Sequence, residues 1–143
     1  MISLILTGHG RIASGIQEAI TQVFGAQADL HVVDFPDGMG TGDLEVRLNE
    51  VLGTCSSETV FFTDLLGGSP FRIASILAQA RPGTEVIAGM NLSMFAEMLF
   101  ERDDIATAAE FRQRAIEAGQ GGITSLADRL ARQQKRAEAV DGL

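Results

Sequence analysis

Residues 4–15 read LILTGHGRIASG, and this stretch decides how the chain folds. A short apolar run ends, His9 follows between two glycines, and apolar residues at helical spacing begin directly afterwards. A run of that length bounded by glycine is typical of a buried strand. The stretch predicts a strand over residues 2–6, a tight turn that carries an imidazole, and a helix over residues 11–24.

The same order of strand, turn and helix recurs along the chain. We expect further strands at residues 29–35, 59–63 and 84–88, and further helices at residues 44–52, 70–80, 92–101 and 107–118. Strands that alternate with helices predict an α/β fold with a doubly wound, mainly four-stranded parallel sheet in the order 2-1-3-4 and helices on both faces. A short final strand is expected within residues 119–126, and residues 127–143 form a polar tail.

Composition narrows the class of protein. The chain has 143 residues, which suits one domain, and its net charge of −8 argues against nucleic acid or an anionic membrane as a partner. No apolar stretch approaches the ~20 residues that span a bilayer, and the start lacks a basic signal-peptide region, so we expect a cytoplasmic protein. The single cysteine, Cys55, excludes an internal disulfide and a zinc site built from cysteines. The pattern offers no metal cluster, and no cofactor is expected.

Two residues that follow strands can form a reactive pair. His9 follows the first strand and Asp64 the third, and these strands are neighbours in the predicted order. Ligands of open parallel sheets bind beyond the carboxyl ends of the strands. A carboxylate that accepts Nδ1–H fixes the tautomer and leaves Nε2 as an oriented nucleophile. His31, in contrast, is expected to be an ordinary sheet-surface histidine without an acidic companion at ligand spacing.

The turn GGSP at residues 67–70 predicts an anion site. Ser69 fits a helix N-cap and Pro70 the first helical position, while Gly67 and Gly68 leave backbone N–H groups uncovered. Uncovered N–H groups at a helix start attract phosphate. We therefore expect Gly67, Gly68 and Ser69, together with Gly10, to surround a phosphoryl group on His9.

Two other activities fit parts of the pattern. Gly8-x-Gly10 after a strand, with Asp34 at the end of the next, matches the start of a Rossmann-like nucleotide-binding fingerprint. That alternative gives the GGSP turn no role. A serine hydrolase would use Ser69, His9 and Asp64, but the motif lacks the second glycine of a nucleophile elbow.

Three motifs also resemble one known family. TGHG after the first strand, FTDLLGGSPFRIAS after the third and VIAGMNLSMFAEML after the fourth are similar to the mannose-family IIA components of the bacterial sugar phosphotransferase system (PTS). The likeness covers residues 1–126. The sequences ILTGHG, FTDLLGGSPFR and GITSL are most similar to those of the N-acetylgalactosamine/galactosamine branch.

The resemblance implies a function, partners and an assembly. His9 would be the phosphorylated histidine, Asp64 its paired aspartate and Ser69 the family's serine in the turn. Phosphate would arrive from the carrier HPr and leave to a IIB component, expected on a separate chain, while membrane IIC/IID components handle the sugar. The subunits would form a cytoplasmic homodimer that exchanges a short antiparallel edge strand around Gly122–Leu126.

Overall fold

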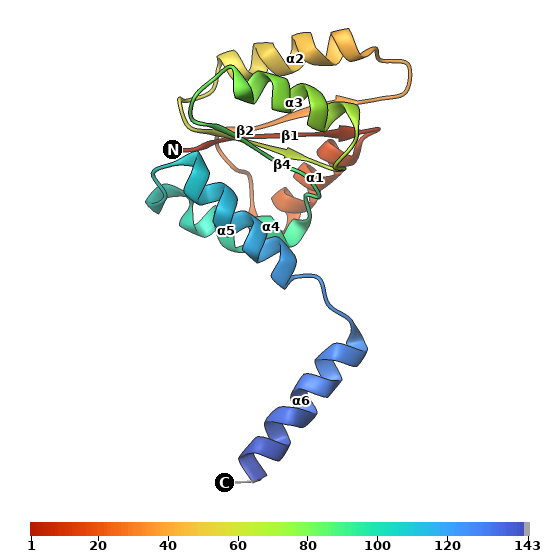
Figure 1. Cartoon of the computed structure of the whole chain (residues 1–143), viewed down its shortest axis with the longest axis vertical. Coiled ribbons are helices and arrows are strands. Elements are labelled where there is room, and N and C mark those ends of the chain that lie inside the picture. Colours follow the sequence, from red (N-terminus) through yellow and green to blue (C-terminus); the bar gives the residue numbers. More distant parts are fainter. Residues whose placement is uncertain (142–143) are drawn as a thin grey trace.

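A parallel sheet with helices on both faces forms the body of the molecule, shown in Figure 1 as a computed structural model that describes residues 1–141. The strands are β1 (Ser3–His9), β2 (Leu30–Phe35), β3 (Thr59–Thr63) and β4 (Thr84–Ile87). They pair in parallel in the order β2-β1-β3-β4, which confirms the predicted topology.

Residues 1–141 form six α-helices, and five of them cover the two faces of the sheet. They are α1 (Ile12–Phe24), α2 (Thr41–Gly53), α3 (Ser69–Gln79), α4 (Leu92–Glu101), α5 (Ala108–Gly121) and α6 (Leu126–Asp141), with a short 3₁₀ turn at Arg102–Asp104. Figure 1 shows α2 and α3 over one face and α1, α4 and α5 over the other. Across residues 1–141, no helix combines the length and the apolar character needed to cross a membrane.

Alternation along the central strands builds one core on each face. In β1, Leu4 and Leu6 pack with Phe62 on the face covered by α1, α4 and α5. The residues between them, Ile5 of β1 and Phe61 of β3, pack on the face covered by α2 and α3. All five side chains are fully buried, and each such burial stabilises the fold by about 1.5–3 kcal/mol.

The paired register brings the carboxyl ends of β1 and β3 to one edge of the sheet. Thr7 lies opposite Thr63, the last residue of β3, so Asp64 follows β3 beside the final residues of β1. The strand β1 is longer than predicted because Gly8 and His9 still pair with β2, after the apolar run has ended. His9 is therefore the last residue of a strand rather than part of a free turn.

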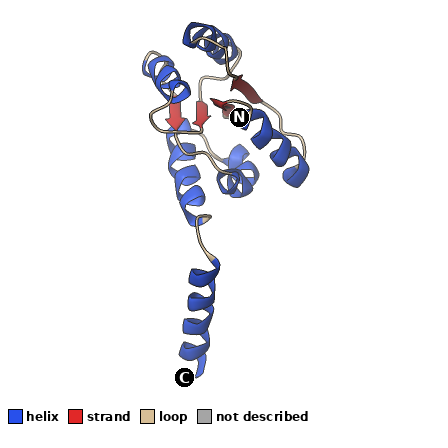
Figure 2. Ribbon diagram, turned by 90° about the vertical axis from the view of Figure 1, so that its right-hand side faces the viewer, coloured by secondary structure: helices blue, strands red, loops and turns tan. Residues whose placement is uncertain are grey.

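The predicted edge strand around Gly122–Leu126 is not formed in the single chain. Gly122 caps the end of α5, residues 123–125 are irregular, and Leu126 begins α6. The first residues of the predicted segment, 119–121, continue α5 instead of leaving it for the sheet. The polar tail is an exposed helix as far as Asp141, and its last residues, 142–143, lie outside the described part of the chain. None of the residues of α6 is buried, and Figures 1 and 2 show this helix projecting away from the sheet.

Candidate active site

His9 and Asp64 meet at the carboxyl edge of the sheet, as the sequence predicts. The Nδ1 atom of His9 lies 2.9 Å from Oδ2 of Asp64, and the same oxygen accepts the backbone N–H of His9 at 2.9 Å. The His9 side chain is 47% exposed, whereas the Asp64 side chain is 10% exposed. Contact through Nδ1 leaves Nε2 as the ring nitrogen available to a visiting group.

Asp64 is held as a carboxylate by its contacts with His9. Burial raises the pKa of Asp64. The hydrogen bonds from the His9 backbone and ring, together with the charge of the ring, lower the pKa by more than burial raises it, so the pKa lies below its ordinary value. Its second oxygen, Oδ1, is buried without a hydrogen-bond partner among the described residues. A carboxylate fixed in this way orients the imidazole and stabilises positive charge on it.

Two glycines make the close approach of these side chains possible. A Cβ atom on Gly68 would lie 2.5 Å from Cε1 of His9 and 3.3 Å from Nε2, so the imidazole packs directly on the Gly68 backbone. A Cβ atom on Gly8 would lie 2.5 Å from Cγ2 of Ile12 and 2.9 Å from Cγ of Asp64. The contact between Gly8 and Asp64 was not predicted, although a glycine inside a strand indicates close approach of other groups.

The turn before α3 differs from its prediction by one residue. Ser69 is the first residue of the helix and Gly68 is the N-cap, so the expected side-chain cap from Ser69 is wrong. The chain reaches the helix in an extended conformation at Gly68, which places Pro70 within the first turn, where its missing N–H costs nothing.

Backbone donors remain available at this helix start. In the part of the chain that the structure describes, the N–H groups of Gly67, Gly68 and Ser69 donate no hydrogen bond. Together with the helix dipole they favour an anion beside the imidazole. The N–H of Gly10 is different, because it donates to the carbonyl of Phe35 at 2.8 Å. Gly10 instead supplies the positive φ of 59° that turns the chain from β1 into α1.

The residue needed for the nucleotide-binding alternative is already engaged. Asp34 accepts hydrogen bonds from the backbone N–H of Ser14 at 3.0 Å and from the Ser14 hydroxyl. Both carboxylate oxygens therefore hold the start of α1 rather than a ribose. Ser69 begins α3 directly after Gly68, on which His9 packs, yet no hydrogen bond joins Ser69 to His9 among the described residues, so the relay of a serine hydrolase is not formed.

His31 contradicts its sequence interpretation. Its Nε2 atom lies 2.7 Å from Oδ1 of Asp29, so the histidine does have an acidic companion. The pair lies at the opposite, amino-terminal edge of the sheet. Asp29 immediately precedes β2 and has a φ of 51°, so the backbone there departs from the regular alternation used to interpret residues 29–35.

The geometry of His9 and its neighbours suits transfer of an anionic group. The site combines an imidazole oriented by a carboxylate at Nδ1 with uncovered backbone N–H donors at a helix start. Phosphoryl transfer requires mainly positioning and stabilisation of charge on the phosphoryl oxygens, which these groups can provide.

Comparisons with known proteins point the same way. The model of the EIIA-man family, described as "PTS system fructose IIA component", matches residues 3–116. A "Putative phosphotransferase enzyme IIA component YadI" of Escherichia coli is 30% identical over 88% of this chain and 87% of the relative. The "PTS system mannose-specific EIIAB component" of Escherichia coli is 31% identical over 87% of this chain but only 39% of the relative's own length.

Solved structures share the fold over nearly the whole chain. The "phosphotransferase system component EIIA from Streptococcus agalactiae" superposes with a TM-score of 0.85 at 28% identity, covering 90% of this chain and 99% of that protein. The "Mannose/sorbose specific IIA subunit" from Enterococcus faecalis superposes with a TM-score of 0.79 at 26% identity, covering 87% and 93%. This chain belongs to the mannose-type IIA family of sugar phosphotransferase system components, a family of phosphotransferases.

Proposed function

We propose that this protein is a phosphohistidine carrier that accepts phosphate from phospho-HPr on Nε2 of His9 and passes it to a IIB component. The observation that carries the proposal is the 2.9 Å contact between Nδ1 of His9 and Asp64, made by a ring that remains half-exposed. That contact leaves Nε2 free beside Gly68, at the start of a helix.

The transfer step follows from this arrangement. The lone pair on Nε2 attacks phosphorus while the N–P bond of the donor phosphohistidine breaks, and the electron pair of that bond returns to the donor imidazole. The ring of His9 becomes positively charged while it carries the phosphoryl group, and Asp64 stabilises that charge through Nδ1–H. The N–H groups of Gly67, Gly68 and Ser69 are placed to donate to phosphoryl oxygens. A nucleophile of the IIB component then attacks the same phosphorus, and the electron pair of the breaking N–P bond returns to the ring of His9.

Exposed apolar side chains around the site fit protein partners. Ile12, Leu65 and Leu66 are 43%, 59% and 67% exposed, and they follow the ends of β1 and β3. Apolar patches of this kind are typical of protein-protein contacts. We assign this surface to the successive docking of HPr and the IIB component.

We also propose that residues 1–126 act as a cytoplasmic homodimer, with residues 127–143 as a tail. Within residues 1–141, β4 pairs with β3 alone, and the groove beside it is lined by Val86, Gly89 and Ile116. Nearby Ile123 and Leu126 are each 74% exposed, as expected for a segment that pairs with a second copy. Sedimentation should give twice the mass of one chain.

For the sugar, we propose the N-acetylgalactosamine/galactosamine branch on the wording of ILTGHG and FTDLLGGSPFR. The descriptions of the family and of the relatives named above include mannose, fructose and sorbose, so the test must compare sugars directly. Deletion of the chain's gene should abolish growth on the amino sugar and spare growth on mannose, fructose and sorbose. Loss of growth on one of those three alone would reject this branch.

The carrier function is tested by phosphorylation in a reconstituted system. With phosphoenolpyruvate, enzyme I and HPr, the protein should gain about one phosphate per chain as an acid-labile, base-stable adduct. His9→Ala should abolish the adduct, and the matched control His31→Gln should retain it. An adduct that persists in His9→Ala, or one that a IIB component cannot remove, would reject the proposal.

A further inference from the structure

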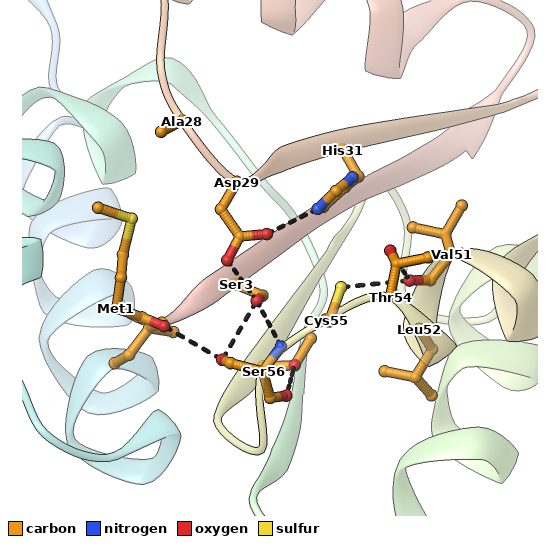
Figure 3. Close-up of polar contacts among 12 residues, drawn as sticks. Met1, Ser3, Ala28, Asp29, His31, Val51, Leu52, Thr54, Cys55 and Ser56 are labelled. Atoms are coloured by element: carbon orange, nitrogen blue, oxygen red, sulfur yellow. Dashed lines mark hydrogen bonds and ion pairs between the residues drawn. The ribbon is translucent and has the colours of Figure 1, made fainter.

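Three different metal-ligating side chains gather at the amino-terminal edge of the sheet, away from His9. Asp29 and His31 come from the start of β2, and Cys55 follows the end of α2 (Figure 3). One ligand atom from each residue, a carboxylate oxygen, an imidazole nitrogen and the thiol sulfur, lies within 4.8 Å of the other two. The carrier function uses none of these groups.

We propose that Asp29, His31 and Cys55 bind a zinc ion. Zinc accepts the combination of sulfur, nitrogen and oxygen ligands, at about 2.0–2.3 Å from each and with tetrahedral geometry. A thiolate and an imidazole together favour zinc over magnesium or calcium, which prefer oxygen ligands alone. The Asp29 and His31 side chains are 30% and 31% exposed, so solvent can deliver the ion and supply a fourth ligand as water.

The cluster has the supporting hydrogen bonds that an ordered metal site needs. The Ser3 hydroxyl, which is fully buried, donates to Oδ2 of Asp29 at 2.6 Å and leaves Oδ1 directed at His31. Ser3 is held in turn, because it accepts the backbone N–H of Ser56 at 2.9 Å. Partners of this kind fix the orientation of a ligating carboxylate.

Binding requires small changes at each ligand. The thiol of Cys55, which donates to the carbonyl of Val51 at 3.3 Å, loses its proton to solvent as the zinc–sulfur bond forms. The proton between Asp29 and His31 leaves Nε2, either for Nδ1 or for solvent, and the two atoms move apart from 2.7 Å to ligand spacing. Burial raises the pKa of the Cys55 thiol, so the metal must drive its ionisation.

The charges around the cluster are compatible with a divalent cation. Asp29 and the Cys55 thiolate would together balance the charge of zinc. Two guanidinium groups lie close by, but both donate to backbone carbonyls: Arg81 to Cys55 at 3.1 Å and Arg102 to Asp29 at 2.7 Å. Their positive charge weakens binding of a cation and at the same time favours the thiolate.

The place of the cluster in the fold indicates what the ion would do. It would join β2 to the segment between α2 and β3, and so cross-link two parts of the chain that are distant in sequence. The length of β1 separates this edge from His9 by roughly 20 Å. Zinc would therefore stabilise the folded chain without touching the phosphorylated histidine, and the inference stands independently of the proposed function.

Cobalt(II) titration of the reduced, metal-free protein tests the site directly. Wild type should develop a sulfur-to-cobalt charge-transfer band in the near ultraviolet, and zinc should remove it by displacement. Zinc at a hundredfold excess over its Kd should raise the midpoint of thermal unfolding by roughly 10 °C. Absence of the band at saturating cobalt would overturn the proposal.

Variants separate this site from zinc bound loosely to the acidic surface. Calorimetric zinc affinity should fall roughly tenfold or more in each of Cys55→Ser, His31→Gln and Asp29→Asn. His9→Gln, which removes the other histidine, should bind zinc as wild type does. Circular dichroism selects the folded variants, and Asp29→Asn is the mildest because asparagine tolerates a positive φ. Equal affinity in wild type and the folded variants would overturn the proposal.

Discussion

The two edges of the sheet each hold a histidine paired with an aspartate, and the pairs differ in which nitrogen is used. At the carboxyl edge, His9 contacts Asp64 through Nδ1 at 2.9 Å. At the amino edge, His31 contacts Asp29 through Nε2 at 2.7 Å. The first arrangement leaves Nε2 of His9 beside Gly68, whereas the second leaves Nε2 of His31 occupied beside a thiol.

This difference indicates that the surroundings set which ligands each histidine-aspartate pair can bind. The carboxyl edge adds uncovered N–H groups at a helix start, which stabilise an anion. The amino edge adds a sulfur atom and a buried hydroxyl, which suit a cation. The sheet therefore carries the same pair of residue types in two settings with opposite electrostatic preference.

Removal of one carboxylate at a time should give the largest difference in transfer rate between the two edges. Asp64→Asn keeps the shape of the side chain but not its charge, so phosphoryl transfer from phospho-HPr should slow on the order of 100-fold. Asp29→Asn should leave the transfer rate within about twofold of wild type. Stopped-flow or quench-flow transfer rates measure both, and a wild-type rate in Asp64→Asn would show that Asp64 is only structural.

A methyl group at Gly8 should disturb the carboxyl-edge pair through packing. The added Cβ would lie 2.5 Å from Ile12 and 2.9 Å from Asp64, so Gly8→Ala should lower the free energy of unfolding by about 1–3 kcal/mol. Gly15→Ala in α1 is the control, because a Cβ there meets nothing within 4 Å. It should instead stabilise the protein by about 0.5–1 kcal/mol. Urea unfolding measures both changes in the free energy of unfolding, and changes of the same sign and size in the two variants would contradict the packing argument.

A methyl group at Gly68 should displace the reactive ring with less effect on stability. Its backbone, at φ −87° and ψ 166°, suits alanine, but the new Cβ would lie 2.5 Å from Cε1 of His9. Gly68→Ala should slow transfer on the order of tenfold. Gly67→Ala, whose Cβ meets nothing within 4 Å, is the matched control and should transfer at nearly the wild-type rate. If the two variants behave alike, the imidazole does not rest on Gly68 during transfer.

Lowering the pH should reduce the free energy of unfolding through the carboxylates at both edges. Burial raises the pKa of Asp29 and of Asp64, but hydrogen bonds and neighbouring positive charges together outweigh burial and leave both folded-state pKa values below their ordinary range. A lowered pKa stabilises the fold above the unfolded-state pKa of about 3.9, and that stability is lost as the pH falls through the folded-state value. Urea unfolding should show the free energy of unfolding declining below roughly pH 4. The free energy of unfolding should decline less steeply with falling pH in Asp64→Asn and Asp29→Asn than in wild type. Slopes equal to that of wild type would contradict the role given to these carboxylates.

The parallel fold and the carboxyl-edge pair could be predicted because local pattern determines both. Apolar, β-branched and aromatic runs predicted the strands, and β3 has the predicted bounds of residues 59–63. Since carboxyl ends of parallel strands meet at one edge, the strand order alone brought His9 to Asp64. The role of Gly68 beneath the imidazole was harder to predict, because it depends on a distance between separate turns.

The amino-edge cluster could not be predicted from spacing. Asp29 reaches His31 only because its backbone adopts a positive φ before β2, which a strand pattern does not anticipate. Cys55 joins them from beyond α2, through tertiary packing. The expected cap by Ser69 is wrong for a local reason, because the helix begins at Ser69 itself, one residue earlier than predicted.

Identification of the phosphorylated nitrogen tests the central claim most directly. Nitrogen and phosphorus NMR of the protein labelled in its histidines, after reaction with phosphoenolpyruvate, enzyme I and HPr, distinguishes the two phosphohistidine isomers. We predict a single phosphohistidine, at His9, with phosphorus on Nε2 and a proton retained on Nδ1 toward Asp64. Phosphorus on Nδ1 of His9, or on His31, would contradict the account.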